Sequence, residues 1–451
     1  MPNSLAHIML FGWPILAGFV IKGRSASEAA VLLLLVPYLL LPYGFGIDLP
    51  LLPPIDKSTL PSLVALFYMR SRYYKFSLIP DNPTLKLLLF LSILYPLCTA
   101  LANGDALVYG PTVRPGLTIS DIISMEFNSF TNRYVPVMLG ATFLATAKSH
   151  RECLRIFIIA GVIYTIPSLW EVRMSPQLHA KFYGYFPHSF GQQMRDGGFR
   201  PVVFLGHGLY VAMFIAMSSI ACAIFWKEKF AEMKKFGFLK MTFMIVVLAL
   251  CKTWSAVIYA VIALLVIQFT STKIWTKVAF VFALIVFLYP MLRAAEVIPT
   301  DDIYEFFLAR SEDRAQSLGF RFMHEDRLLE KAGERSLFGW GGWGRQRIWD
   351  PITGEDLSVI DGTWVGVYGA YGWLGYLSFF GLLCIPIFLL MFGEAKKKFV
   401  VPVYTAGLGF LLSINLVDLL PNSSLNSITF LIAGAIFGYV NRGYTVEERL
   451  T

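Results

Sequence analysis

Long apolar runs recur along almost the whole chain, and they restrict its fold more than any other feature. Most are about 17–25 residues long, the length that a helix needs to cross roughly 30 Å of hydrocarbon. A lone strand would leave its backbone groups unpaired in lipid, so each run is expected to be helical. Charged residues make up only 15% of the 451 residues, whereas soluble domains contain about a quarter. The sequence therefore predicts an all-α polytopic membrane protein.

The number of membrane spans depends on one short segment. The run 60–69 either crosses the membrane or lies at its surface, which gives about 12 spans (12–13). With 12 spans both ends of the chain are predicted to be cytoplasmic, and with 13 the N-terminus is outside. No basic segment and small-residue cleavage site precede the first run, so it is predicted to be a span. The other predicted spans are 7–22, 28–44, 85–103, 133–148, 153–170, 203–226, 238–251, 254–271, 274–293, 363–392, 399–416 and 425–441.

Lysine and arginine gather in short clusters beside the spans, at 70–75, 148–155, 227–240, 273–277 and 396–398. Cytoplasmic connections retain such residues, so the alternate connections are predicted to be extracytoplasmic. Because the clusters flank spans, the net charge of +8 does not indicate nucleic-acid binding. The predicted extracytoplasmic connections are 104–132, 171–202, the turn around Lys252, 294–361 and 417–424.

Three parts follow from this pattern. Residues 1–293 hold the N-terminal spans, residues 294–361 form one large periplasmic loop, and residues 362–451 hold the C-terminal spans. The loop separates the span that ends near 293 from the span that starts near 363. The five cysteines lie in or beside spans without paired spacing, so neither a disulfide nor a zinc site is indicated. No metal and no cofactor are predicted.

The large loop is a polar block between long apolar segments, and loops held by a rigid scaffold often carry the working residues. On a helix Arg321, Glu325 and Leu328 share one face. Ordinary solvation is the alternative for these charges. The glycine-rich run 338–345 contains Trp340 and Trp343. Both are candidate sugar platforms, although tryptophans at a membrane interface are also common anchors.

A second polar group lies in the connection 171–202 and in the turn at Lys252. Arg195 and Arg200 precede an apolar run, and guanidinium groups bind a diphosphate bidentately while staying charged. Lys252 is expected to complete this cationic pocket, and His188 is a candidate contact for a sugar. In the alternative, these cations face lipid headgroups. His207 is read either as part of the site or as a hydrogen-bonded core histidine.

Asp361 lies where the large loop meets the span that begins at Thr363. A carboxylate there is a candidate general base toward a sugar hydroxyl. It is equally a candidate N-cap for the following helix. The two roles are compatible.

This layout resembles the O-antigen ligase and Wzy-type polysaccharide polymerase superfamily. The run 337–345, then Asp361-Gly362 and Gly369 to Gly375, is similar to that family's P-x-x-G-x-G stretch, polar re-entry motif and G-x-x-G helix. Arg195-Asp-Gly-Gly198 matches its arginine–glycine element, and 250–256 is similar to its T-x-S-R-G helix start. Two positions differ, since Ala256 replaces an arginine and Asp361 takes the place of a histidine. The pattern is that of a divergent exopolysaccharide-type member.

The resemblance implies a metal-independent membrane glycosyltransferase in the bacterial inner (cytoplasmic) membrane. Such an enzyme moves a saccharide from undecaprenyl diphosphate to an acceptor hydroxyl at the periplasmic face, as a ligase or a polymerase. Arg195, Arg200, Lys252 and Arg321 are then expected to bind the diphosphate, and Asp361 or Glu325 to serve as the base. The expected partners are the lipid-linked glycan, the bilayer and polysaccharide-assembly proteins.

Two other functions stay open. A transporter or flippase for lipid-linked saccharides would place ionisable groups within its spans and often shows related halves with interrupted helices. A noncatalytic component of envelope-polysaccharide assembly is consistent with the two replaced family residues. The predicted spans are nearly free of charge, and no half-to-half similarity is evident.

Overall fold

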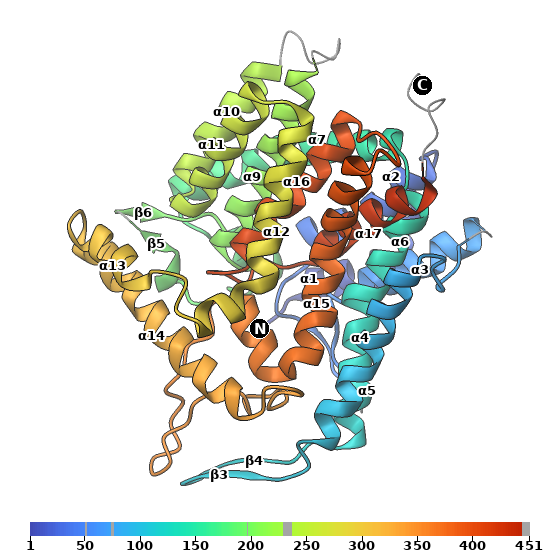
Figure 1. Ribbon diagram of the computed structural model, residues 1–451. Helices are drawn as coiled ribbons and strands as arrows, with labels where there is room; N and C mark the ends of the chain where they lie inside the picture. Colours follow the sequence, from blue (N-terminus) through green and yellow to red (C-terminus); the bar gives the residue numbers. More distant parts are fainter. Residues whose placement is uncertain (50–51, 74–75, 196, 229–236, 444–451) are drawn as a thin grey trace.

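The computed structural model describes residues 1–49, 52–73, 76–195, 197–228 and 237–443, and within them the chain is mainly helical (Figure 1). Three short antiparallel pairs accompany the helices: β1 (Gly46–Ile47) with β2 (Ile55–Asp56), β3 (Leu107–Tyr109) with β4 (Thr112–Arg114), and β5 (Met194–Arg195) with β6 (Gly198–Phe199). The helices are α1 (Ser4–Val20), α2 (Ala26–Leu40), α3 (Leu60–Arg72), α4 (Pro83–Leu101), α5 (Ile119–Ser129), α6 (Val135–Phe143), α7 (Ala147–Met174), α8 (Leu178–Tyr183), α9 (Gly208–Lys227), α10 (Gly237–Leu250), α11 (Trp254–Phe269), α12 (Thr272–Ala294), α13 (Thr300–Leu308), α14 (Glu312–Glu334), α15 (Thr363–Ala395), α16 (Val403–Asp418) and α17 (Ser427–Arg442).

The helical architecture predicted from the sequence is confirmed. Among the described residues, the five helices α4, α7, α9, α12 and α15 are long and apolar enough to cross a membrane. Five shorter apolar helices, α1, α2, α10, α11 and α16, accompany them. The connection between α12 and α15 runs from 295 to 362, which is where the large loop was expected. This set of helices supports a multi-pass membrane protein.

The packing separates a central helix from an outer layer. Helix α9 is apolar on all sides and almost entirely buried between α7, α10, α11 and α16 (Figure 1). The outer helices instead expose large apolar side chains, such as Phe19 (71%), Ile166 (67%) and Phe269 (81%). Soluble proteins seldom expose apolar surface so widely. The outer layer therefore has the character of a lipid-facing surface.

The helical stretch of α5 and α6, which precedes α7, begins earlier than the predicted span 133–148. Residues 104–132 were predicted to be a connection, but α5 continues through a π-helical turn (Phe130–Tyr134) into α6 without a break. The prediction was wrong because polar residues, including Asn128, Asn132 and Arg133, interrupt the apolar pattern. A π-helical turn is frequent at functional sites.

The predicted span 363–392 is also interrupted. At Gly372 the backbone of α15 leaves the helical region, with φ 60° and ψ −162°. Residues 336–341 of the large loop dock on the break: the amides of Trp373 and Leu374 donate to the carbonyls of residues 336 and 337, at 2.8 and 3.1 Å. On the other side, the carbonyls of Gly369 and Ala370 accept from residues 340 and 341. The loop thus replaces the helical hydrogen bonds that the break removes.

Contacts at both ends of α3 show the direction of the first helices. Asn3 bonds to residues 182 and 183, beyond the C-terminal end of α7, whereas Ser27 bonds to Glu152 near the other end of α7. Lys57, just before α3, donates to the carbonyl of Leu41, which follows α2, at 2.9 Å. Arg72, at the end of α3, donates to the carbonyl of Ile21 at 3.1 Å. Helix α3 therefore runs from the end of the bundle that holds Asn3 to the opposite end.

The strained backbone at Gly372 generates a prediction. A Cβ atom there would lie about 2.5 Å from the backbone of Leu337, and its φ/ψ region costs a non-glycine residue about 1–3 kcal/mol. Gly372→Ala should lower the midpoint of thermal unfolding in detergent by at least several degrees. Gly369→Ala is the matched control, because its Cβ meets nothing closer than 3.6 Å. Equal stability of the two variants would contradict the docking.

Candidate functional site

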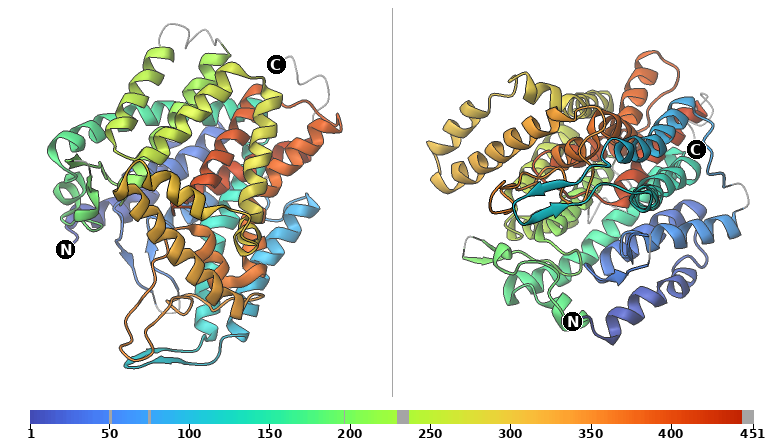
Figure 2. Two further views of the ribbon diagram at one scale, coloured as in Figure 1. Left: turned by 60° about the vertical axis from the view of Figure 1, so that its left-hand side comes forward. Right: turned by 90° about the horizontal axis from the view of Figure 1, so that it is seen from below.

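Several of the connections predicted to share one side of the membrane contact one another. Arg345 is 1% exposed and donates to the carbonyls of Asp105 and Pro115 at 2.9 and 2.8 Å. The β3–β4 hairpin also meets the large loop, where Thr112 donates to the carbonyl of Gly354 at 2.9 Å. Figure 2 shows the hairpin and this loop together at the lower end of the molecule. The amide of Thr363 donates to the carbonyl of Leu419 at 3.0 Å.

A buried carboxylate shapes the connection 171–202. Glu171, at the end of α7, is fully buried and accepts the amides of Leu178, Val202 and Val203, each at 2.7 Å. One side chain thereby ties both the start and the end of the connection to its helix. These bonds hold the β5–β6 hairpin beside the turn between α10 and α11 (Figure 1).

The structure brings Arg195, Arg200 and Lys252 together. The Arg200 guanidinium donates to the Lys252 carbonyl at 3.1 and 3.3 Å, and the Lys252 ammonium donates to the Arg195 carbonyl at 3.0 Å. Arg195 is exposed, and the other two are half-buried. Two separate connections therefore contribute to one group of cations, the cationic cluster of Arg195, Arg200 and Lys252.

The two histidines near this cluster differ in role. The His207 ring accepts the amide of Leu209 at 3.0 Å and so caps α9, which supports the structural interpretation of this residue. His188 is exposed, and its ring meets that of His207 edge-on at 4.9 Å. His207 also lies within electrostatic range of Arg200. His188 is therefore the accessible histidine beside the cationic cluster.

Asp361 forms an ion pair with Arg321. The Arg321 Nε lies 3.2 Å from a carboxylate oxygen of Asp361, and the side chains are 30% and 39% exposed. The predicted N-cap role of Asp361 was wrong, because Gly362 occupies the cap position and no side chain caps the helix. Carbonyls of residues 419 and 422 accept the amide of Thr363 instead. The Asp361 carboxylate is thus available to solvent beside a fixed cation.

Glu325 lies on the inner side of α14, and Arg321, Glu325 and Leu328 face the bundle from one side of this helix. Glu325 is 7% exposed, accepts the Trp364 indole at 3.4 Å and lies 3.9 Å from Arg293. Burial raises the pKa of this carboxyl to about 7, although Arg293 acts in the opposite direction. This environment makes Glu325 a packing residue and leaves Asp361 as the accessible carboxylate.

The two candidate tryptophans are in different environments. Trp340 is 8% exposed, its indole donates to the Lys331 carbonyl at 2.7 Å, and the Arg335 guanidinium covers its ring at 4.2 Å. Trp343 is 52% exposed and has a positive φ of 55°. Only Trp343 presents an accessible ring face to a sugar.

A cavity of about 450 Å³ lies among the helices, and the sequence did not predict it. It is lined mainly by polar side chains: Tyr38, Tyr43, Asp56, Lys57, Ser58, Asn128, Asn132, Arg133, Tyr210, Ser424, Asn426 and Ser427. Burial lowers the pKa of Lys57 to about 7, and its ammonium donates to the carbonyls of Leu41 and Phe204. Arg133 donates to the Tyr95 hydroxyl at 2.8 Å. The spacing of Asn128, Asn132 and Arg133 on one helix was the signal available in the sequence.

Contacts connect this cavity with both charged groups. Tyr210 lines it and meets the His207 ring at 5.9 Å, on the side of Arg200. Ser424 lines it and bonds to the buried Asp418, which lies within electrostatic range of Arg321. Neither charged group lines the cavity itself, and one intervening residue, His207 or Asp418, relates each group to the cavity wall.

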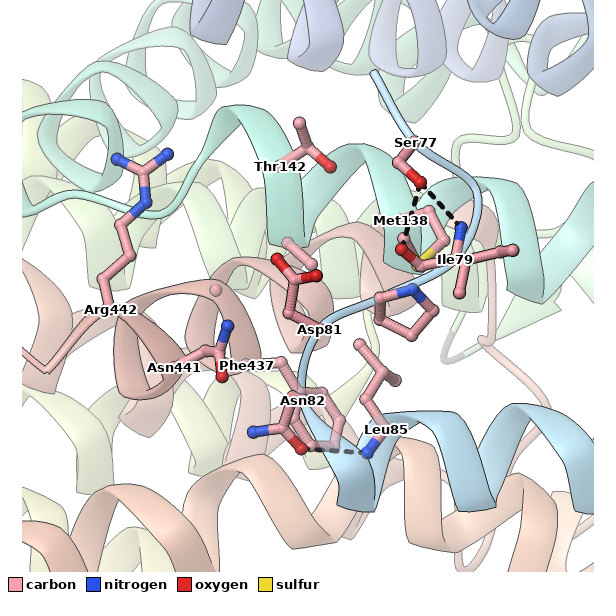
Figure 3. Close-up of a pocket in the computed structure, with 13 residues that line it drawn as sticks. Ser77, Ile79, Asp81, Asn82, Leu85, Met138, Thr142, Phe437, Asn441 and Arg442 are labelled. Atoms are coloured by element: carbon pink, nitrogen blue, oxygen red, sulfur yellow. Dashed lines mark hydrogen bonds between the residues drawn. The ribbon is translucent and has the colours of Figure 1, made fainter. Parts of the chain in front are cut away.

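A smaller cavity of about 220 Å³ lies elsewhere, with Asp81, Asn82, Thr142 and Asn441 in its wall (Figure 3). Helix α17 begins beside the large cavity and ends beside this one. Its 16 residues correspond to about 24 Å. The smaller cavity is therefore separate from the candidate site.

The raised pKa of Glu325 generates a prediction about stability. A carboxyl whose folded pKa lies above its usual value stabilises the fold below about pH 4.5, and this contribution is lost as the pH rises through about 7. Glu325→Gln should therefore raise the unfolding midpoint at pH 8 and change it less at pH 5. Glu330→Gln, at an exposed position of α14, is the control. If Glu325→Gln changed the unfolding midpoint equally at pH 5 and pH 8, the raised pKa of Glu325 would be contradicted.

No protein-family model matches the chain, and no curated protein matches it.

Proposed function

We propose that this protein is a membrane glycosyltransferase that moves a saccharide from undecaprenyl diphosphate to an acceptor hydroxyl. The proposal combines the resemblance in the sequence with two charged groups, the cationic cluster and the Arg321–Asp361 pair. In the reaction, the acceptor oxygen bonds to the anomeric carbon and the bond from that carbon to the diphosphate breaks. The lipid diphosphate leaves with the electron pair, and a base takes the hydroxyl proton.

The observation that carries the proposal is the joining of Arg200 and Lys252 across two connections. A leaving diphosphate needs positive charge that is already in place when the bond breaks. Backbone carbonyls hold both cations, so little reorganisation is required. Asp361 is the candidate base, because it is accessible and lies next to Arg321.

We infer an arrangement of 13 crossings, with α3 among them. This count follows from the course of α3 between opposite ends of the bundle. With this count, the basic clusters favour an N-terminus outside, a C-terminus in the cytoplasm and a candidate site on the outer side. The resemblance adds the proposal that this side is the periplasmic face of a bacterial inner membrane. Helix α3 has only 13 residues, or about 20 Å, so its crossing requires a thinner apolar layer around it.

A transporter of lipid-linked saccharides is the second candidate. Two observations favour it: Arg133 lines a cavity among the helices, and α15 is interrupted at Gly372. Intramembrane charges and broken helices are common in transporters. A noncatalytic role in polysaccharide assembly is the third. Both alternatives differ from the enzyme in needing no general base.

The diphosphate site is tested at Arg200. Arg200→Ala should reduce glycan transfer at least about a hundredfold, since a charged donor to the leaving group is lost. Arg200→Lys should recover only a small part, because an ammonium does not reproduce the planar guanidinium. The assay follows transfer from the lipid-linked donor by purified protein. Arg173→Ala, which changes an exposed arginine at the end of α7, is the control. Normal transfer by Arg200→Ala would exclude this site.

The base is tested at Asp361. Asp361→Asn keeps the size of the side chain and a hydrogen bond to Arg321 but removes the proton acceptor, so transfer should fall about 10²–10⁴-fold. Thermal unfolding should stay nearly unchanged. Asp356→Asn is a matched control, because Asp356 forms a similar pair with Arg347 in the same loop at 2.5 Å. Full transfer with Asp361→Asn would favour the transporter or the assembly role.

A further inference from the structure

A groove of about 330 Å³ runs along the surface between α2 and α7. Its wall is apolar over most of its length, and the lining residues come from both helices: Leu32, Leu35, Val36, Leu39, Ile156, Ile159, Ala160 and Ile163. Ile159 and Ile163 are 51% and 60% exposed. The groove therefore opens on the outer, apolar layer of the bundle.

The length of the groove matches one leaflet of a bilayer. On α2 its lining extends from Glu28 to Leu40, which is about 18 Å of helix. Half of the hydrocarbon core is about 15 Å thick. An acyl chain that lies along the groove therefore stays within a single leaflet.

Charge gathers at one end of the groove. Arg24 and Arg155 line this end together with Glu28. Glu28 already accepts the amide of Ser25 at 3.2 Å as part of the capping box of α2. Within the described ranges, neither the Arg24 nor the Arg155 guanidinium has a hydrogen bond or an ion pair. Two unpartnered guanidinium groups at the head of an apolar groove fit a phosphate ester that carries an acyl tail.

The charged end of the groove lies at the end of the bundle that is opposite to the cationic cluster, so a lipid bound there belongs to the opposite leaflet. Arg24 follows α1, and Arg155 lies in the first part of α7, where Glu152 bonds to Ser27. This end of the bundle is opposite to the one that holds the cationic cluster of Arg195, Arg200 and Lys252. The groove is therefore separate from the proposed glycan site, and its occupant does not depend on that function.

We propose that this groove binds one anionic phospholipid. The two guanidinium groups bind the headgroup phosphate, and one acyl chain lies against α2 and α7. All phospholipids carry this phosphate, so the phosphate does not distinguish between them. The positive charge of Arg24 and Arg155 favours those whose headgroup has a net negative charge. Salt weakens this preference, because both arginines are exposed.

The experiment measures lipid binding by the purified full-length protein in detergent. Native mass spectrometry is used to titrate it with phosphatidylglycerol and with phosphatidylcholine that carry the same acyl chains. The unsubstituted protein should retain phosphatidylglycerol about tenfold more tightly at low salt. The double variant Arg24→Ala/Arg155→Ala should bind both lipids equally and weakly.

Two further variants make the test specific. Ile159→Trp fills the groove from a half-exposed position, so it should reduce the binding of both lipids while the thermal unfolding midpoint is retained. Lys396→Ala/Lys398→Ala removes the same charge from exposed positions after α15 and should leave the preference unchanged. The proposal is overturned by equal binding of both lipids to the unsubstituted protein. It also fails if the preference survives in the double arginine variant, or if the lysine control abolishes it.

Discussion

The position of the cationic cluster depends on one buried carboxylate. Glu171 accepts three backbone amides from the connection that follows its own helix. Two of these amides, those of Val202 and Val203, lie close in sequence to Arg200, whose guanidinium donates to the carbonyl of Lys252. A single residue at the end of α7 therefore anchors both the start and the end of the connection that carries the two arginines.

Much of the fold was predictable because lipid permits few structures. The apolar runs located the helices to within a few residues, and the boundaries of the large loop were close to those observed. The failures have a common cause. Polar residues interrupt the apolar pattern where α5 continues into α6, and the break at Gly372 depends on backbone hydrogen bonds to residues 336–341, which an apolar pattern does not reveal.

The site was predictable in part. Arg200 and Lys252 were expected to share one cationic pocket although they belong to two separate connections, and the Arg200 guanidinium contacts the Lys252 carbonyl. Lys57 and Arg133 were missed, since they line a cavity that forms only when helices distant in sequence pack together. Trp340 looked like a sugar platform, but its ring is covered by Arg335. Residue type indicated the chemistry, and tertiary contacts decided which residues are accessible.

The docking of residues 336–341 on α15 has a consequence for biogenesis. These residues leave the ribosome before α15, and their carbonyls accept the amides of Trp373 and Leu374. Until they dock, the interrupted helix has backbone donors without acceptors, which lipid strongly disfavours. The nascent chain must therefore keep residues 336–341 close to the translocation channel while α15 is integrated. A long insertion between this stretch and α15 would delay integration even if the finished structure could accommodate it.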